Sequence, residues 1–107
     1  MIINKTEHDV VIRFENGSER IYPPEPLPAR VGSVAIDVAV IDGVQIVKTV
    51  FTEVVNLPVA IVNTFYIVSA FVIAAVPGRR DLVRPDTGPD CIRDEAGKII
   101  AVRRLTR

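Results

Sequence analysis

The chain has very few of the residues from which disulfides and zinc sites are built. Its 107 residues include one cysteine, Cys91, and one histidine, His8. One copy therefore holds neither an internal disulfide nor a Cys/His zinc site, and we expect no metal and no cofactor. A reducing cytosol is the natural compartment for such a chain, and no apolar signal region follows Met1.

An excess of charge of one sign is also missing, because 13 basic and 13 acidic residues balance. The two signs are unevenly spread. Residues 1 to 76 carry five basic and eight acidic side chains, and residues 77 to 107 carry eight basic and five acidic ones. The positive C-terminal third favours a small anionic partner, but its arginines alternate with aspartates, so nucleic-acid binding is not expected.

The most apolar stretch, Leu57–Val76, has 20 residues without a charge, the length of a membrane span. Pro58, Asn63 and Ser69 interrupt it, and the Val/Ile-rich segment Val59–Val68 favours a strand. We therefore expect no membrane partner, but a buried strand followed by a buried helix. A chain of 107 residues fits a single domain over residues 1 to 107.

Two turn dipeptides predict hairpins. Asn16-Gly17 separates His8–Phe14 from Ser18–Tyr22, and Asp42-Gly43 separates Arg30–Ile41 from Val44–Phe51. In the second hairpin the spacing predicts one shared face for the residues Val34, Ile36, Val38 and Val40. A third hairpin is expected from Cys91–Arg93, a turn over 94 to 97 and Lys98–Leu105.

The rest of the layout follows from proline, glycine and serine. Pro23–Pro28 should cross the surface as a connector, because its prolines lack amide donors. Ser69 offers an N-cap, and Pro77-Gly78 ends the helix after about two turns. We expect an α+β fold, mainly antiparallel β hairpins forming a small curled sheet or barrel, with the strand Phe65–Val68 and one short buried helix at about 70 to 76.

Several short motifs carry a resemblance to a known family. They are Tyr22-Pro23-Pro24, Ala29-Arg30-Val31, Asp42-Gly43-Val44, Tyr66-Ile67-Val68-Ser69, Pro77-Gly78-Arg79, Pro85-Asp86-Thr87-Gly88-Pro89 and Arg93-Asp94-Glu95-Ala96-Gly97-Lys98-Ile99-Ile100. In this order they resemble a family of small uncharacterised proteins of bacteriophages, prophages and some bacteria, over nearly the whole chain. The resemblance implies a phage-associated accessory protein in the bacterial host cytosol, and no activity. At Leu57–Asn63, where relatives are expected to be polar, the apolar residues point to an added interface.

Polar chemistry is concentrated in Pro77–Arg93, a segment dense in proline, arginine and aspartate after the most apolar stretch. Arginine guanidinium groups suit phosphate or carboxylate, and amides at a helix start suit an anion. The competing interpretation of these arginines is ion pairing with the aspartates of the same segment. The candidate ligand-binding residues are Tyr66, Ser69, Arg79, Arg80, Arg84, Asp86, Thr87 and Arg93.

No residue is assigned a catalytic role. Asp86-Thr87-Gly88 matches the aspartic-protease triplet, but prolines bracket it and 19 residues follow it, so an Asx turn is the better interpretation. His8 has no nucleophile partner in the pattern, and Ser69 lacks the glycine frame of a hydrolase elbow. Cys91 is expected to be an inert thiol.

Two function classes remain, with a small enzyme of unknown reaction third. The leading one is a non-catalytic phage-associated binder of a small anionic ligand, such as a nucleotide-derived immune signal. The alternative is a protein-interaction or homo-oligomerisation module, using strand edges and the apolar surface near Leu57–Val62 on another copy or on a host protein. A binder should gather its arginines around one pocket, whereas a module should disperse them and expose an apolar face. Because half of the chain is apolar, we expect a homo-oligomer in either case.

Overall fold

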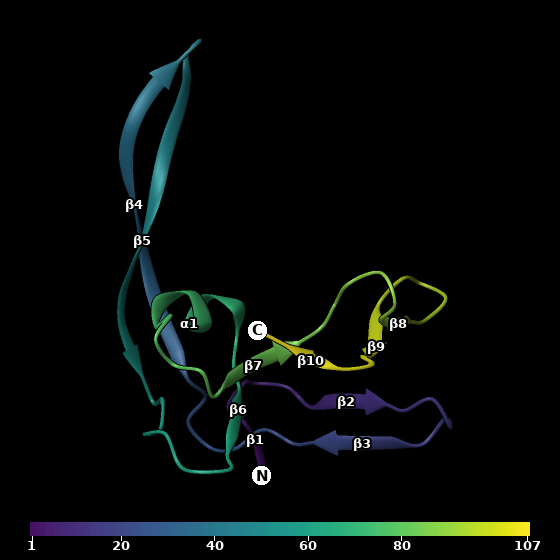
Figure 1. Ribbon diagram of the computed structural model, residues 1–107. Helices are drawn as coiled ribbons and strands as arrows, with labels where there is room; N and C mark the ends of the chain where they lie inside the picture. Colours follow the sequence, from purple (N-terminus) through teal and green to yellow (C-terminus); the bar gives the residue numbers. More distant parts are fainter.

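The computed structural model describes all 107 residues, which form ten strands and one short helix (Figure 1). The elements are β1 Ile2–Asn4, β2 Val10–Arg13, β3 Glu19–Tyr22, β4 Arg30–Ile41, β5 Val44–Val55, β6 Phe65–Ile67, α1 Ala70–Ala75, β7 Leu82–Pro85, β8 Ile92–Arg93, β9 Ile99–Ala101 and β10 Leu105–Thr106. The prediction of a β-rich chain with antiparallel hairpins and one short helix is confirmed. The strands form four separate small sheets, and no sheet closes into a barrel.

The largest sheet has the strand order β1-β6-β7-β10. β6 pairs in parallel with β1 and β7, and β10 pairs antiparallel with β7. Tyr66, Ile67 and Val68 are at most 1% exposed. Because side chains alternate along a strand, Tyr66 and Val68 join one apolar cluster with Leu82, while Ile67 joins a second cluster with Ile12. A short apolar run buried on both faces therefore organises the core.

The strand predicted over Val59–Val68 is shorter than expected. Only Phe65–Ile67 is strand, and the segment Val59–Val62 lies exposed outside any strand. Asn63 adopts a left-handed φ of 59°, which is incompatible with a continuous strand through it. No helix is long and apolar enough to cross a membrane.

Both predicted turn dipeptides form hairpins, and the first one joins β2 to β3. In the second, Asp42 has a φ of 54° and Gly43 a φ of 75°, the two left-handed conformations of a type I′ turn. The first strand of this hairpin has the predicted bounds, and the second continues to Val55 instead of ending at Phe51.

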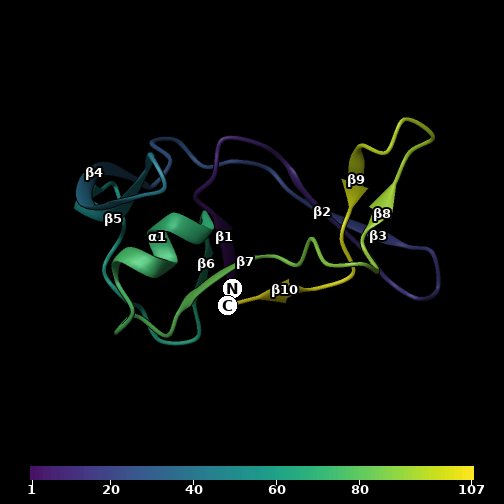
Figure 2. The same cartoon turned by 90° about the horizontal axis from the view of Figure 1, so that it is seen from above.

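Helix α1 begins where the sequence predicts, because the Ser69 hydroxyl accepts a hydrogen bond from the Val72 amide at 3.3 Å. The expectation of a fully buried helix is wrong. Only Val72 is buried, and Phe71 is 67% exposed. The helix packs with one side on the base of β4 and β5 and on β7, so its other side faces solvent (Figure 2).

The C-terminal third differs from the prediction in two places. Pro77–Arg93 is not a single loop, because it contains β7, a strand of the largest sheet. The third hairpin is reduced to β8 and β9, and the chain then returns as β10 along β7. The strand expected over Lys98–Leu105 is interrupted at Val102, which is buried and forms a bridge with Ile12 instead.

The β4–β5 hairpin projects from the rest of the molecule, and we call its residues 33 to 51 the arm (Figure 1). It accounts for the elongated shape, with principal extents of 52 × 38 × 21 Å. No residue between Arg30 and Asn63 is buried. The core therefore lies wholly outside the arm.

Candidate functional site

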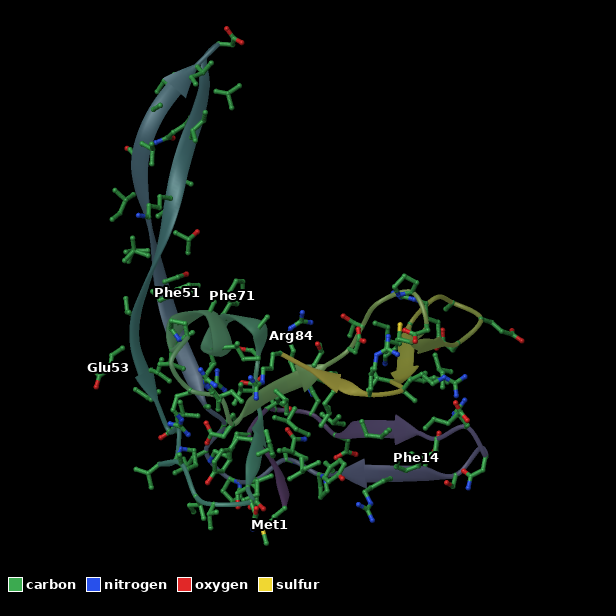
Figure 3. All side chains as sticks on the ribbon, in the orientation of Figure 1. Met1, Phe14, Phe51, Glu53, Phe71 and Arg84 are labelled. Carbon is green, nitrogen blue, oxygen red and sulfur yellow. The ribbon has the colours of Figure 1, made fainter.

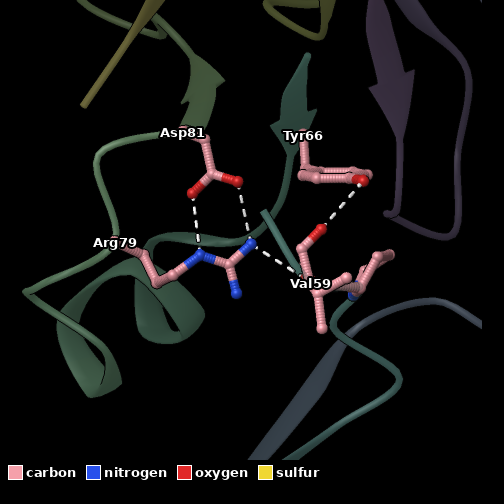
Figure 4. A network of polar contacts seen from close by, with 5 residues as sticks. Val59, Tyr66, Arg79 and Asp81 are labelled. Atoms are coloured by element: carbon pink, nitrogen blue, oxygen red, sulfur yellow. Dashed lines mark hydrogen bonds and ion pairs between the residues drawn. The ribbon is translucent and has the colours of Figure 1, made fainter. Parts of the chain in front are cut away.

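Arg79 is held by its neighbours. Its Nε and Nη2 atoms donate to the two carboxylate oxygens of Asp81, each at 2.8 Å, and Nη2 also donates to the Pro58 carbonyl at 2.9 Å (Figure 4). Nearby, the buried Tyr66 hydroxyl donates to the Val59 carbonyl at 3.4 Å. These contacts tie the segment after β5 to the start of β7, so Arg79 acts here as a structural clamp.

The clamp perturbs both of its charged groups. The pKa of Asp81 lies below its ordinary value, chiefly because the Arg79 guanidinium donates to the carboxylate, although partial burial opposes this shift. The pKa of Arg79 is raised by the same hydrogen bonds. A guanidinium already engaged with a carboxylate has few donors left for a ligand.

Asp86 shapes the chain around itself. Its Oδ1 atom accepts from the Gly88 amide at 3.1 Å, which is the Asx turn expected from the sequence, and its Oδ2 atom accepts from Arg104 Nε at 2.7 Å. The Gly88 amide is the first cause, and Arg104 the second, of a lowered Asp86 pKa. Arg104 also pairs with Asp90 at 3.2 Å. The sequence did not single out Arg104, because it lies 18 residues from Asp86.

The four predicted arginines are dispersed. Arg93 donates to the Gly97 carbonyl within its own turn at 2.7 Å, while Arg80 and Arg84 form no ion pair. None of the four surface hollows is lined by Arg79, Arg80, Arg84 or Arg93. The structure does not bring these residues together around one cavity.

The other predicted site residues also lie apart. Tyr66 is 1% exposed, so its ring is not available for stacking. Ser69 borders a hollow near the base of the arm, and Thr87 borders a different hollow beside β2 and β9. The amide that Ser69 caps belongs to a helix of only six residues.

The arm has one apolar and one mixed face, and pairing across the strands defines both. Directly opposed residues share a face, so Val34 and Val50 lie with Ile36 and Lys48. Beyond them towards the tip, the same face continues with the residues Ala39, Ile46, Ile41 and Val44. We call this set, with Lys48 as its one charged member, the apolar face.

The opposite face of the arm is mixed in polarity. Its members are Ser33, Ala35, Asp37, Val40, Gln45, Val47, Thr49 and Phe51. A hydrogen bond from the Gln45 amide to the Asp37 carboxylate confirms that these two side chains share it. At its base, Phe51 lies against Phe71 of α1, with ring centroids 6.1 Å apart (Figure 3). This face is therefore the one that turns towards the helix.

The predicted face Val34, Ile36, Val38 and Val40 is wrong beyond Ile36. The pairing is regular up to Asp37 and Val47, and the next pair is Ala39 with Ile46. Val38 is thus an extra residue in a β-bulge, which moves Val40 to the mixed face and Ala39 and Ile41 to the apolar face. The bulge extends the apolar face to the tip.

A hollow of about 530 Å³ lies at the base of the arm. It is bordered by Glu7, His8, Arg30, Gly32 and Phe71, among others. Because α1 contributes Phe71 and its N-cap Ser69, the hollow lies between the start of β4 and the helix. A Cβ on Gly32 would lie 2.5 Å from the Thr52 hydroxyl, which explains a glycine at this position.

Comparison of the chain with protein-family models, with curated proteins and with solved structures finds no match.

The exposed arm is the feature that the sequence indicated only in part. Exposed strand edges and apolar surface at Leu57–Val62 were expected, and Val59, Ile61 and Val62 are indeed 54–85% exposed. The larger apolar surface, on the arm, was not expected to be exposed, because Val/Ile-rich strands are typical of a buried core. The available signal was the length of the second hairpin, whose strands of 12 residues extend beyond the small body that could cover them.

Proposed function

We propose that this protein is a homo-oligomeric interaction module whose arm docks on a second copy. The observation that carries the proposal is the apolar face of the arm, which no other part of the chain covers. The face's valines and isoleucines are 36–62% exposed, and Figure 3 shows arm side chains standing clear of the body.

The exposed area suits a specific interface. The six valines and isoleucines of the apolar face present on the order of 500 Å², and polar residues at its rim would add the rest of a standard contact. A standard interface buries about 800 Å² per partner, whereas the largest apolar patch of a monomer is usually about 300–600 Å².

The arm also needs a partner for its own order. The strands β4 and β5, whose outer parts form the arm, have 12 residues each, and fixing the backbone costs roughly 1–2 kcal/mol per residue. A two-stranded hairpin alone is at best marginally stable in water. Covering half-exposed valines and isoleucines contributes about 1 kcal/mol for each side chain, which offsets part of that cost.

A second copy is the partner that the chemistry favours. The apolar face is complementary to itself, because Lys48 is its only charged residue. The net charge is zero, so two copies do not repel each other over a distance. The outer edges of both arm strands are unpaired, which leaves backbone groups open to another chain. The proposal keeps the phage-associated setting that the sequence resemblance implies.

Two valines near the tip provide a matched test. Val44 is 62% exposed on the apolar face, and Val40 is 70% exposed on the mixed face. We expect Val44→Asp to weaken self-association at least tenfold in sedimentation equilibrium, and Val40→Asp to leave it nearly unchanged. Equal self-association of the two variants would show that the apolar face is not the interface. A monomeric wild-type protein would contradict self-association and favour a host protein as the partner.

Binding of a small anionic ligand is a second proposal, and Arg84 favours it. This arginine lies on β7, is only partly exposed and forms no ion pair. Thermal shift with anionic metabolites and cyclic nucleotides tests it, because a ligand at a hundred times its Kd stabilises the folded state by about 2.7 kcal/mol. The shift should be lost in Arg84→Ala. Absence of any shift in the wild-type protein would contradict this second proposal.

A further inference from the structure

We infer that two copies lie with their arms antiparallel, and that the tip of each arm lies beside Arg30 at the base of the other. The inference depends on the proposed self-association and specifies its orientation. The tip is the turn Ile41–Val44. The base is the start of β4, where Arg30 pairs with Val55.

The apolar face decides between the two ways of overlaying the arms. About ten residue steps of roughly 3.3 Å separate tip from base, so two antiparallel arms overlap along the whole face. In a parallel overlay the two bodies, each up to 38 Å across in the second dimension, would meet at the same end. The same overlay would also place Asp42 beside Asp42 of the other copy. The antiparallel overlay puts the bodies at opposite ends and buries the face in full.

Charge is complementary in the antiparallel arrangement. Asp42 is exposed at the tip, and the Arg30 side chain is 61% exposed at the base. Arg30 pairs with Glu7 through Nη2 alone, so its other guanidinium donors remain free to bind a second carboxylate.

Apolar contacts are complementary as well. Ile41 and Val44, 56% and 62% exposed, flank the tip turn, and Val34 and Val50, 52% and 36% exposed, lie on the apolar face towards the base. Each tip thus brings two apolar side chains and one carboxylate to a base that offers two valines and a guanidinium.

Lys48 is compatible with this arrangement. It lies on β5, close to the middle of the apolar face. Its aliphatic stem packs on apolar surface while the ammonium group extends past the strand edge into water. The two lysines therefore need not approach each other across the symmetry axis.

Cysteine cross-linking tests the arrangement directly. In a Cys91→Ser background, the variant with Asp42→Cys and Arg30→Cys carries its two thiols at opposite ends of one arm, beyond the reach of a disulfide within one copy. We expect mild oxidation to give a covalent dimer closed by two disulfides. The control with Asp42→Cys alone should stay largely uncross-linked, because the tips lie far apart.

Charge exchange provides the second measurement. Asp42→Arg alone and Arg30→Asp alone should each self-associate roughly tenfold more weakly than the wild-type protein, because like charges then meet at both ends. An equimolar mixture should recover wild-type association, since each tip then faces an opposite charge.

The possible failures are distinguishable. A wild-type protein that associates, but gives neither the 42–30 disulfide nor recovery in the mixture, overturns the antiparallel docking and leaves the proposed function standing. A monomeric wild-type protein overturns both.

Discussion

Asn4 shows at the scale of a single residue how a buried polar side chain fixes the chain around it. Its amide nitrogen donates to the carbonyls of His8 and Tyr22 at 2.7 and 2.8 Å, and its Oδ1 atom accepts from the amide and the hydroxyl of Thr6 at 2.9 and 2.6 Å. The residue is 1% exposed. It links β1 to the following turn and to the end of β3, which the sequence did not indicate.

Replacing this side chain should be costly. Asn4→Ala removes the donor to the Tyr22 and His8 carbonyls and the acceptor for Thr6, all in part-buried contacts, so we expect a loss of about 1–3 kcal/mol in the free energy of unfolding. Urea denaturation measures it. Asn16→Ala, in an exposed turn with the same type of side-chain bond, is the control and should cost less than 1 kcal/mol.

Arg79 has a structural role in the fold, whereas Arg84 forms no ion pair, so the two alanine variants should differ in stability. Arg79→Ala removes the contacts to Asp81 and Pro58 and should destabilise the protein by about 2 kcal/mol, because a partly buried carboxylate and a carbonyl lose their donor. Arg84→Ala should leave the melting temperature within a few degrees of wild type. Equal melting temperatures of the two variants would contradict the structural role of Arg79.

The lowered Asp81 pKa gives the clamp a pH dependence. A carboxyl whose pKa is depressed in the folded state stabilises the protein above its unfolded-state value of 3.8, and this contribution is lost as the pH falls through the folded-state pKa. The difference in unfolding free energy between wild type and Asp81→Asn should therefore be largest near neutral pH and shrink below about pH 4. A difference that is independent of pH would show that the ion pair does not contribute.

At the scale of elements, the turns were the most predictable part and burial the least. Gly17, Asp42 and Gly43 adopt left-handed backbone, a local property that the Asn-Gly and Asp-Gly dipeptides indicate directly. Ser69 likewise marks the start of α1. Whether a Val/Ile-rich strand is covered depends on contacts with residues far away in the sequence, so the exposure of the arm and of Phe71 was not predicted. The bulge at Val38 moved the residues beyond it to the opposite face from the one expected.

The arm turn itself is open to a test. Gly43 has a φ of 75° and no atom within 4 Å of an added Cβ, so Gly43→Val acts through backbone strain alone and should cost about 1 kcal/mol or more. Hydrogen exchange of arm amides should accelerate. Gly78→Ala, equally uncrowded but without a positive φ, should change neither exchange nor melting.

At the scale of the whole molecule, the structure divides into a body with two apolar clusters and an arm without a core. The body explains how the chain folds, because β6 is buried from both sides. The arm is the region that calls for a partner, since its apolar face combines substantial area with unpaired strand edges. Within the predicted arginine segment, Arg79 pairs with Asp81, and Asp86 pairs with Arg104 further along the chain.

Sedimentation velocity of the wild-type protein, from micromolar to hundreds of micromolar, tests the central claim most directly. The account predicts a mass of two or more 11.8 kDa copies that falls towards the monomer mass only on dilution. A monomer mass throughout this range would contradict it.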